Sequence, residues 1–159
     1  MASTPTEVRD TADLDTARRR RTTPPGAGLR TPVAAEVTVL RPAAADGDGT
    51  LRAATTVVID EREPVFPGHY PGLPIFPGVC VIECVHLSCL AATPPGAGRQ
   101  ALEAVESARF LSPVFPGDRL DIDLVWSGEP PALRSTARVR TARGEAARVR
   151  VRFRPLEAS

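Results

Sequence analysis

The segment VCVIECVHLSCLAA, residues 79–92, constrains the fold more than any other part of the chain. Pro77 and Gly78 stand where a helix can begin, and the turn sequence PPGAG (94–98) follows its end. The resulting helix is apolar on all sides, so it must be buried all round. No apolar run approaches the roughly 20 residues that a membrane-spanning helix needs. We therefore expect the helix to form the centre of a globular core.

Short segments with strand character surround this helix. A Gly/Asp turn at 46–49 joins the first two, which predicts a hairpin. The strand candidates are 33–40, 51–60, 101–111, 119–126, 132–141 and 146–154.

The last two candidates carry arginine at every second position, which places the arginines on one face of each strand. The arginines are Arg138, Arg140, Arg148, Arg150, Arg152 and Arg154, and the residues expected on the opposite face are Val139, Val149, Val151 and Phe153. This pattern predicts an α+β fold in which a mostly antiparallel sheet wraps over one buried helix. One sheet cannot cover such a helix completely, so we expect a second subunit.

Composition bounds the function. The net charge is +1, and the sequence contains no lysine, which excludes Schiff-base chemistry, pyridoxal-phosphate anchoring and a GK[ST] phosphate loop. Residues 1–31 have no apolar periodicity and are expected to be a disordered Arg/Thr/Pro-rich tail, followed by a single domain at 32–156. Without an apolar segment after its arginines, the tail does not resemble a secretory signal, and we expect a cytoplasmic protein.

The three cysteines lie within the apolar helix. They lack the paired spacing of a metal site, and an odd number does not suit a disulfide framework. Cys80, Cys84 and Cys89 are interpreted as small packing residues of the core. No metal or cofactor is expected.

The loop FPGHYPGLPIFPG, residues 66–78, holds one of the two histidines between three Pro-Gly pairs. Proline fixes φ and glycine permits sharp turns, so His69 is expected to have little positional freedom. Fixed position suits a general base, although a connector with a structural histidine has the same pattern.

Glu83 lies among apolar residues of the helix. Because burial disfavours the charged form of a carboxyl group, we expect Glu83 to be able to hold a proton near neutral pH. The alternative is a buried glutamate that pairs with an arginine or caps a polar cavity. His86, one turn further on, is interpreted as a core or interface histidine.

Gly78 would present a free backbone N–H at the helix N-terminus, where a carbonyl oxygen gaining negative charge is stabilised. A base, an acid and an oxyanion donor together suit proton abstraction beside a carbonyl with loss of a β-substituent. This chemistry is elimination of water from a 3-hydroxyacyl compound.

The stretch FPGHYPGLPIFPGVCVIE resembles the active-site segment of the 3-hydroxyacyl-[acyl-carrier-protein] dehydratases. A second block, ESARFLSPVFPGDRLDIDLVW (106–126), resembles the later strand pair of that family. The resemblance implies the hot-dog fold, a curved antiparallel sheet around a long central helix. It also implies dehydration of a carrier-protein-bound 3-hydroxyacyl thioester, in fatty acid or polyketide-type secondary metabolism.

The resemblance implies roles for individual residues. His69 would remove the proton from carbon 2, Glu83 would protonate the departing hydroxyl, and Gly78 N–H would hold the thioester carbonyl. Residues Phe66, Val79, Phe110 and Pro116 would shape an acyl tunnel. It further implies a homodimer or trimer of dimers, with the histidine and the acid of one site supplied by different subunits.

Three departures from that family stand out. Leu87 occupies a position where its members usually carry glutamine; the usual N-terminal proline-histidine segment is absent; and Cys80, Cys84 and His86 make the helix unusual. They favour a specialised enzyme.

Several alternatives stay open. An enoyl isomerase or an acyl-thioesterase could use the same residues, and a non-catalytic acyl-binding partner of a synthase would explain Leu87. The arginine strands lack the interleaved aromatic residues of a nucleic-acid-binding surface and are interpreted as a solvated face. If they bind a partner, an acidic acyl carrier protein is the candidate.

Overall fold

A computed structural model describes residues 33–68, 72 and 74–157. The expected tail at 1–31 and His69 lie outside the described residues. Within them, the elements in chain order are β1 (Val37–Ala45), β2 (Leu51–Val58), the short 3-10 helix η2 (Phe66–Gly68), α1 (Gly78–Ala91), β3 (Gln100–Phe110), β4 (Arg119–Ser127), β5 (Arg134–Thr141) and β6 (Gly144–Pro155).

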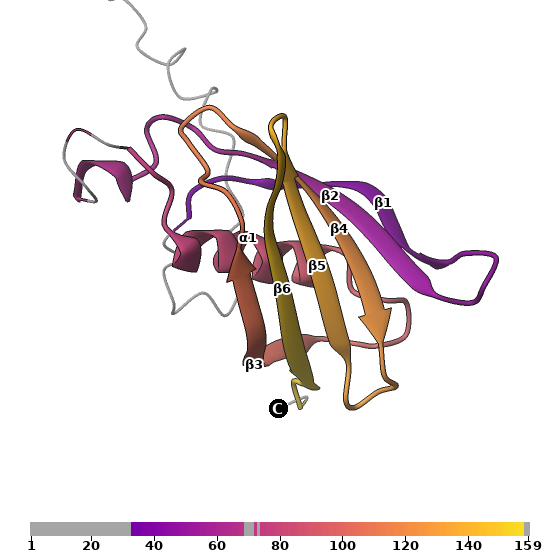
Figure 1. The fold of residues 1–159 in the computed structure, drawn as a ribbon. Coiled ribbons are helices and arrows are strands. Elements are labelled where there is room, and N and C mark those ends of the chain that lie inside the picture. The colour runs from indigo at the N-terminus through magenta and orange to yellow at the C-terminus, as the bar shows by residue number, and fades with distance from the viewer. Residues whose placement is uncertain (1–32, 69–71, 73, 158–159) are drawn as a thin grey trace, which may run out of the picture. The chain divides into compact units, whose positions relative to one another are not determined.

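The strands form a single sheet in the order β1-β2-β4-β5-β6-β3, and every neighbouring pair is antiparallel. The sheet bends around α1, which lies against its concave face (Figure 1). Strand β3 follows the helix in sequence but pairs with the last strand, β6, so β1 and β3 are the two edges. The predicted antiparallel sheet wrapped over one helix is confirmed.

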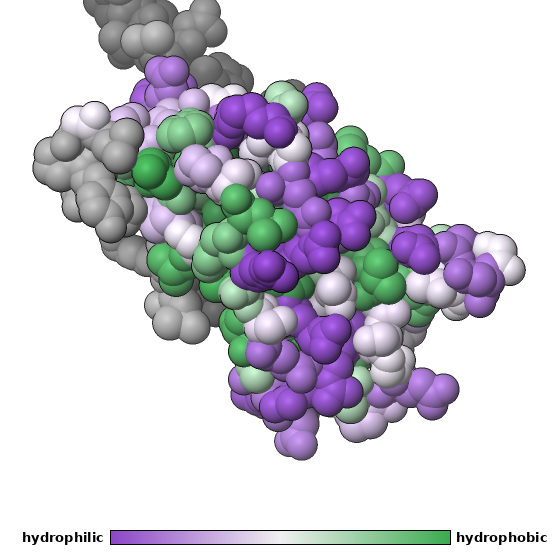
Figure 2. Space-filling view, viewed as in Figure 1, coloured by the Kyte–Doolittle hydropathy of each residue, from purple (hydrophilic) through white to green (hydrophobic). Residues whose placement is uncertain are grey.

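Apolar and arginine side chains alternate along β5 and β6, so the apolar face of the sheet lies against the helix. Val139, Val149, Val151 and Phe153 are at most 1% exposed, whereas the intervening arginines lie on the outer face. Most of the outer surface over these strands is hydrophilic (Figure 2). The face assignment made from period two is therefore confirmed.

Helix α1 has two different faces, and the sheet of its own chain covers only one of them, as expected. The sheet buries the face made of Cys80, Val81, Cys84, Val85, Ser88 and Cys89. A hydrogen bond of 2.8 Å from Thr55 Oγ1 to Ser88 Oγ joins this face to β2. The opposite face carries Val79 and Leu90, which are 67% and 39% exposed, with Ile82, Glu83, His86 and Leu87 partly buried between them. One sheet covers only one side of a helix.

The cysteines pack in the core as predicted. All are free and buried. Burial raises the pKa of each thiol, to about 12 for Cys84 and Cys89.

The first strand differs from its prediction, beginning at Val37 and not at Val33. Glu63, which is 2% exposed, accepts the backbone N–H of Ala34 through Oε2 at 2.9 Å. Val33 is buried in the core outside the sheet. This contact holds residues 33–36 beside the loop that follows β2, away from the strand. Among the described residues, no helix has the length and apolar character to cross a membrane.

Candidate active site

The two sequence blocks singled out above meet at the N-terminus of α1. Phe76 donates its backbone N–H to the carbonyl oxygen of Val114 at 2.8 Å, and the two residues form an isolated antiparallel bridge. This bridge joins the loop that enters the helix to the segment that leaves β3. Residues about forty positions apart in the chain thereby form one local structure.

The second contact between the blocks is that of Phe110 with Gly78. The aromatic ring of Phe110 lies directly over the Gly78 backbone, in space that a larger residue's β-carbon would need. Only glycine allows the ring and the first turn of the helix to approach this closely.

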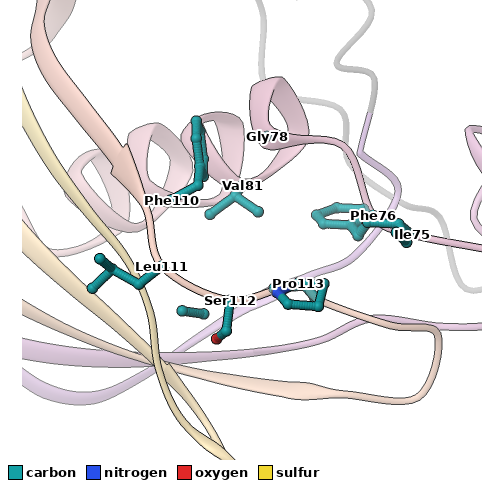
Figure 3. Close-up of a pocket in the computed structure, with 10 residues that line it drawn as sticks. Ile75, Phe76, Gly78, Val81, Phe110, Leu111, Ser112 and Pro113 are labelled. Carbon is teal, nitrogen blue, oxygen red and sulfur yellow. The ribbon is translucent and has the colours of Figure 1, made fainter.

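A cavity of about 360 Å³ opens between these segments. In Figure 3, Val81 and Phe110 lie on the helix side of the cavity, and Ser112 and Pro113 lie opposite. The lining is mostly apolar: Ile75, Phe76, Gly78, Val81, Phe110, Leu111, Ser112, Pro113, Val114 and Ala146. A cavity with this lining suits an acyl chain.

Backbone N–H groups stand open beside this cavity. Pro77 is the N-cap residue, and its carbonyl oxygen accepts the N–H groups of Cys80 and Val81 at 2.9 and 3.1 Å. The N–H groups of Gly78 and Val79 precede these first hydrogen bonds of the helix, so they have no acceptor within α1. They are the donors that could bind a carbonyl oxygen, and the partial positive charge of the helix N-terminus adds to them.

Glu83 lies on the partly exposed face of α1, away from the residues that line this cavity. Its side chain is 22% exposed, and its Oε2 lies 3.2 Å from Nδ1 of His86, whose side chain is 21% exposed. The sequence analysis missed this pairing, although the separation of three residues on a helix could have indicated it. The carboxyl group therefore belongs to the side of α1 that the sheet leaves uncovered.

The turn Phe115-Pro116-Gly117-Asp118 anchors the second block. Asp118 accepts the Phe115 N–H at 2.8 Å, and Arg143 donates to both of its carboxyl oxygens at 2.9 and 2.5 Å. These hydrogen bonds hold the pKa of Asp118 below its usual range. Gly117, with φ +86°, donates its N–H to Ile59 at 2.6 Å, which ties the turn to the end of β2.

The other predicted tunnel residues lie outside the cavity lining. Phe66 packs its ring against Phe76 at 5.9 Å, so it supports one wall from behind. Val79 projects from the helix surface, and Pro116 lies in the turn before Asp118. Of the predicted site residues, Gly78 and Phe110 come together, whereas Glu83 is on another face of the helix. His69 stays a prediction, since it lies outside the described residues.

No group of three or more His, Cys, Asp or Glu side chains in the described part of the chain is placed to hold a metal ion.

Comparisons with known proteins agree with this architecture. The family model described as ApeI-like, ApeI dehydratase, matches residues 46–147. The 3-hydroxyacyl-[acyl-carrier-protein] dehydratase FabZ of Symbiobacterium thermophilum is 45% identical over 73 residues, 42% of this chain and 51% of that enzyme. The chain thus spans about half the length of this curated relative.

Solved structures show the same fold at low sequence identity. The dehydratase heterocomplex ApeI:P from Xenorhabdus doucetiae aligns with a TM-score of 0.55 and 19% identity, covering 75% of this chain and 98% of that one. The putative thioesterase yhdA from Lactococcus lactis aligns with a TM-score of 0.62 and 8% identity, covering 78% and 94%. The expected hot-dog fold is confirmed. Because the family model matches more than half of the chain, this protein belongs to the ApeI-like dehydratase family.

Proposed function

We propose that the protein dehydrates a 3-hydroxyacyl thioester to the 2-enoyl thioester. The observation that carries this proposal is the open helix N-terminus at Gly78 beside an apolar cavity built from both motif blocks. A thioester carbonyl bound by the Gly78 N–H would gain negative charge as the carbon 2 proton leaves, and the helix end stabilises that charge.

Each group has one task in this mechanism. His69 takes the proton from carbon 2, and the electron pair of that bond forms the carbon 2–carbon 3 double bond. The carbon 3–oxygen bond breaks as Glu83 gives its proton to the departing hydroxyl, which leaves as water. The proton held by His69 must return to Glu83 or to solvent before the next turnover.

The placement of Glu83 favours a site shared by two chains. The carboxyl group lies on the partly exposed face of α1, and it is not among the residues of the cavity that holds the Gly78 N–H. Edge strand β3 also exposes apolar side chains, with Val105 at 42% and Phe110 at 50%. A second copy covering these surfaces would bring its own Glu83 to the cavity, as a homodimer or as a trimer of dimers.

The arginine face is proposed to receive the carrier protein. Arg134 lies directly opposite Arg152 in the sheet, and Arg138 lies directly opposite Arg148. Like charges placed in this way repel each other. Glutamates from β3 and β6 and Asp123 of β4 offset part of this charge, but among the described residues Arg150 and Arg154 have no acidic side chain within ion-pair distance. An acidic acyl carrier protein would complement the remaining charge, with binding that weakens as salt rises.

The test is turnover of a 3-hydroxybutyryl thioester, offered on a carrier protein and on a short pantetheine mimic. Wild type and His69→Ala are compared at equal folded concentration, and the conjugated enoyl product is followed. We expect enoyl formation in the wild type and a loss of at least 100-fold in the variant. Near-zero rates for both proteins across several chain lengths would instead favour a non-catalytic acyl-binding partner.

A second candidate is thioester hydrolysis, because a putative thioesterase shares the fold. A carboxylate such as Glu83 can position the attacking water. The same reactions distinguish the two activities, since hydrolysis releases a free thiol and dehydration does not. Thiol release without enoyl product would replace the proposed activity by hydrolysis.

A further inference from the structure

Glu83 and His86 form a side-chain pair on α1. Both side chains are about one-fifth exposed and lie outside the buried face of α1, and Nδ1 of His86 lies 3.2 Å from Oε2 of Glu83. This distance allows a hydrogen bond between the imidazole nitrogen and a carboxyl oxygen, with the donor set by the protonation of the two groups. The histidine therefore restricts where the carboxyl group can point.

The imidazole ring is itself held in place from the other side. It stacks on the ring of Phe153 with centroids 6.3 Å apart and an angle of 29° between the planes. Phe153 is 1% exposed in the core, where it packs against Trp126 at 5.8 Å. A continuous series of packed rings thus runs from the buried sheet to the carboxyl group of Glu83.

Leu87, next to His86 in the sequence, has no side-chain polar atom that could hydrogen-bond to the Glu83 carboxyl group. The i,i+4 spacing places the Leu87 side chain beside Glu83 on the helix surface, at a position where a side-chain amide would reach the carboxyl group. Residue 87 is apolar and offers no hydrogen bond, whereas His86 supplies one to Glu83.

We propose that His86 is a positioning residue that fixes the orientation of the Glu83 carboxyl group. This inference rests on the proposed function in one respect, namely that Glu83 is the acid of the dehydration. Its effect is to hold the proton-donating group in line with the departing hydroxyl. Loss of such alignment by about 1 Å costs on the order of 100-fold in rate.

Two substitutions separate positioning from packing. His86→Gln keeps a side chain that can hydrogen-bond to Glu83 but removes the stacked ring, whereas His86→Phe keeps the ring but removes Nδ1. We expect kcat for dehydration to fall about 10- to 100-fold in His86→Phe and less than about 5-fold in His86→Gln, with KM nearly unchanged in both. The reverse order, with phenylalanine tolerated and glutamine not, would overturn the proposal in favour of a packing role.

A rescue experiment tests by a gain of activity whether a hydrogen bond to Glu83 orients its carboxyl group. In the His86→Phe background, Leu87→Gln places an amide one position away, within reach of Glu83. We expect the double variant to recover several-fold in kcat over His86→Phe alone. A further cycle in the Glu83→Gln background should show no additional loss from His86→Phe, because the group being positioned is gone. If the losses in kcat from His86→Phe and Glu83→Gln simply add, His86 does not act through Glu83 and the proposal is contradicted.

A third measurement does not depend on turnover. The chain has only two histidines, so protein labelled with 15N-histidine gives two sets of imidazole signals, and His69→Ala identifies which set belongs to His86. We expect Glu83→Gln to shift the Nδ1 signal of His86 more than its Nε2 signal. An unchanged Nδ1 signal would show that the contact is absent in solution and would overturn the proposal. If the wild type forms no enoyl product while this shift is seen, the dehydration proposal fails and the pairing stands.

Discussion

The ring of Phe110 packs onto Gly78 so closely that a β-carbon built at residue 78 would lie 2.7 Å from Cζ of the ring. Gly78→Ala must therefore push the ring away. Because Phe110 is 50% exposed, its ring can turn toward solvent. We therefore expect the free energy of unfolding, measured in urea, to fall by less than about 1 kcal/mol. The cavity wall moves with the ring, so kcat/KM for the 3-hydroxyacyl thioester should fall about 10-fold.

A double-mutant comparison checks the cause of this loss. If displacement of the ring is responsible, Gly78→Ala adds little further loss in a Phe110→Ala background. A full additional 10-fold loss there would place the effect in the backbone N–H groups of the helix instead.

The proposed sharing of the active site between subunits predicts complementation. Homodimers of His69→Ala and of Glu83→Gln each lack one group in both sites. If the two groups of a site come from different chains, half of the dimers formed on mixing are mixed, and each regains one intact site. Reassembly from equal amounts should thus recover about a quarter of the wild-type rate. The measurement is enoyl formation after joint refolding, with each variant refolded alone as control. No recovery despite mixed dimers would show that one chain supplies both groups.

The edge strand β3 offers a test of the dimer itself. Val105 lies opposite Val151 in the edge pair of the sheet, and its side chain is 42% exposed. Val105→Lys should move the protein toward the monomer in light scattering while leaving the far-ultraviolet dichroism unchanged, since edge strands carrying lysine resist pairing. Ser127→Lys, at the exposed end of β4, is the matched control. If Val105→Lys leaves the molar mass in solution unchanged, edge strand β3 is not part of the contact between subunits.

Asp118 should stabilise the fold in a pH-dependent way. Its hydrogen bonds from Arg143 and from the Phe115 N–H lower its pKa in the folded state, so its contribution is present above the unfolded value near 4. That contribution disappears as the pH falls through the folded value. Asp118→Asn should lower the free energy of unfolding by about 1–2 kcal/mol at pH 7, measured in urea. The difference in free energy of unfolding between Asp118→Asn and the wild type should narrow as the pH falls below about 4.

Asp60 provides the control for this experiment. Hydrogen bonds from Arg62 also lower its pKa, but the pair lies on the surface, where such pairs contribute little. We expect Asp60→Asn to unfold like the wild type at every pH. If Asp118→Asn and Asp60→Asn lower the free energy of unfolding equally, the hydrogen bonds of Asp118 contribute no more than a surface ion pair.

The cysteines should be unreactive in the folded protein. Burial raises the pKa of Cys84 and Cys89 to about 12 and also raises that of Cys80, so almost no thiolate is present at pH 8. A disulfide reagent should therefore titrate all three thiols in guanidinium and react with them only on the timescale of unfolding in buffer. Rapid reaction of one thiol in buffer would mean that the inner face of α1 opens easily.

Local patterns predicted most of the secondary structure. The period of two on β5 and β6 decides which side chains enter the core, and this property depends only on neighbouring residues. The start of β1 was misplaced because Glu63, far along the chain, holds Ala34 away from the sheet. Likewise, the pairing of β3 with β6 depends on contacts that no local pattern contains.

The site was predictable to a different extent at each position. The glycine at residue 78 signals a close approach, but nothing local identifies Phe110 as the partner. The pairing of Glu83 with His86 follows from helical spacing, yet the apolar neighbours suggested a core or interface histidine. The catalytic role of His69 stays a prediction.

The two faces of α1 have a consequence for how the sequence of this helix can change. The residues that the sheet buries and Glu83 with its partly buried neighbours occupy different faces of one short helix. Selection can therefore exchange the side chains around Glu83 for a new substrate while the inner residues keep the fold intact.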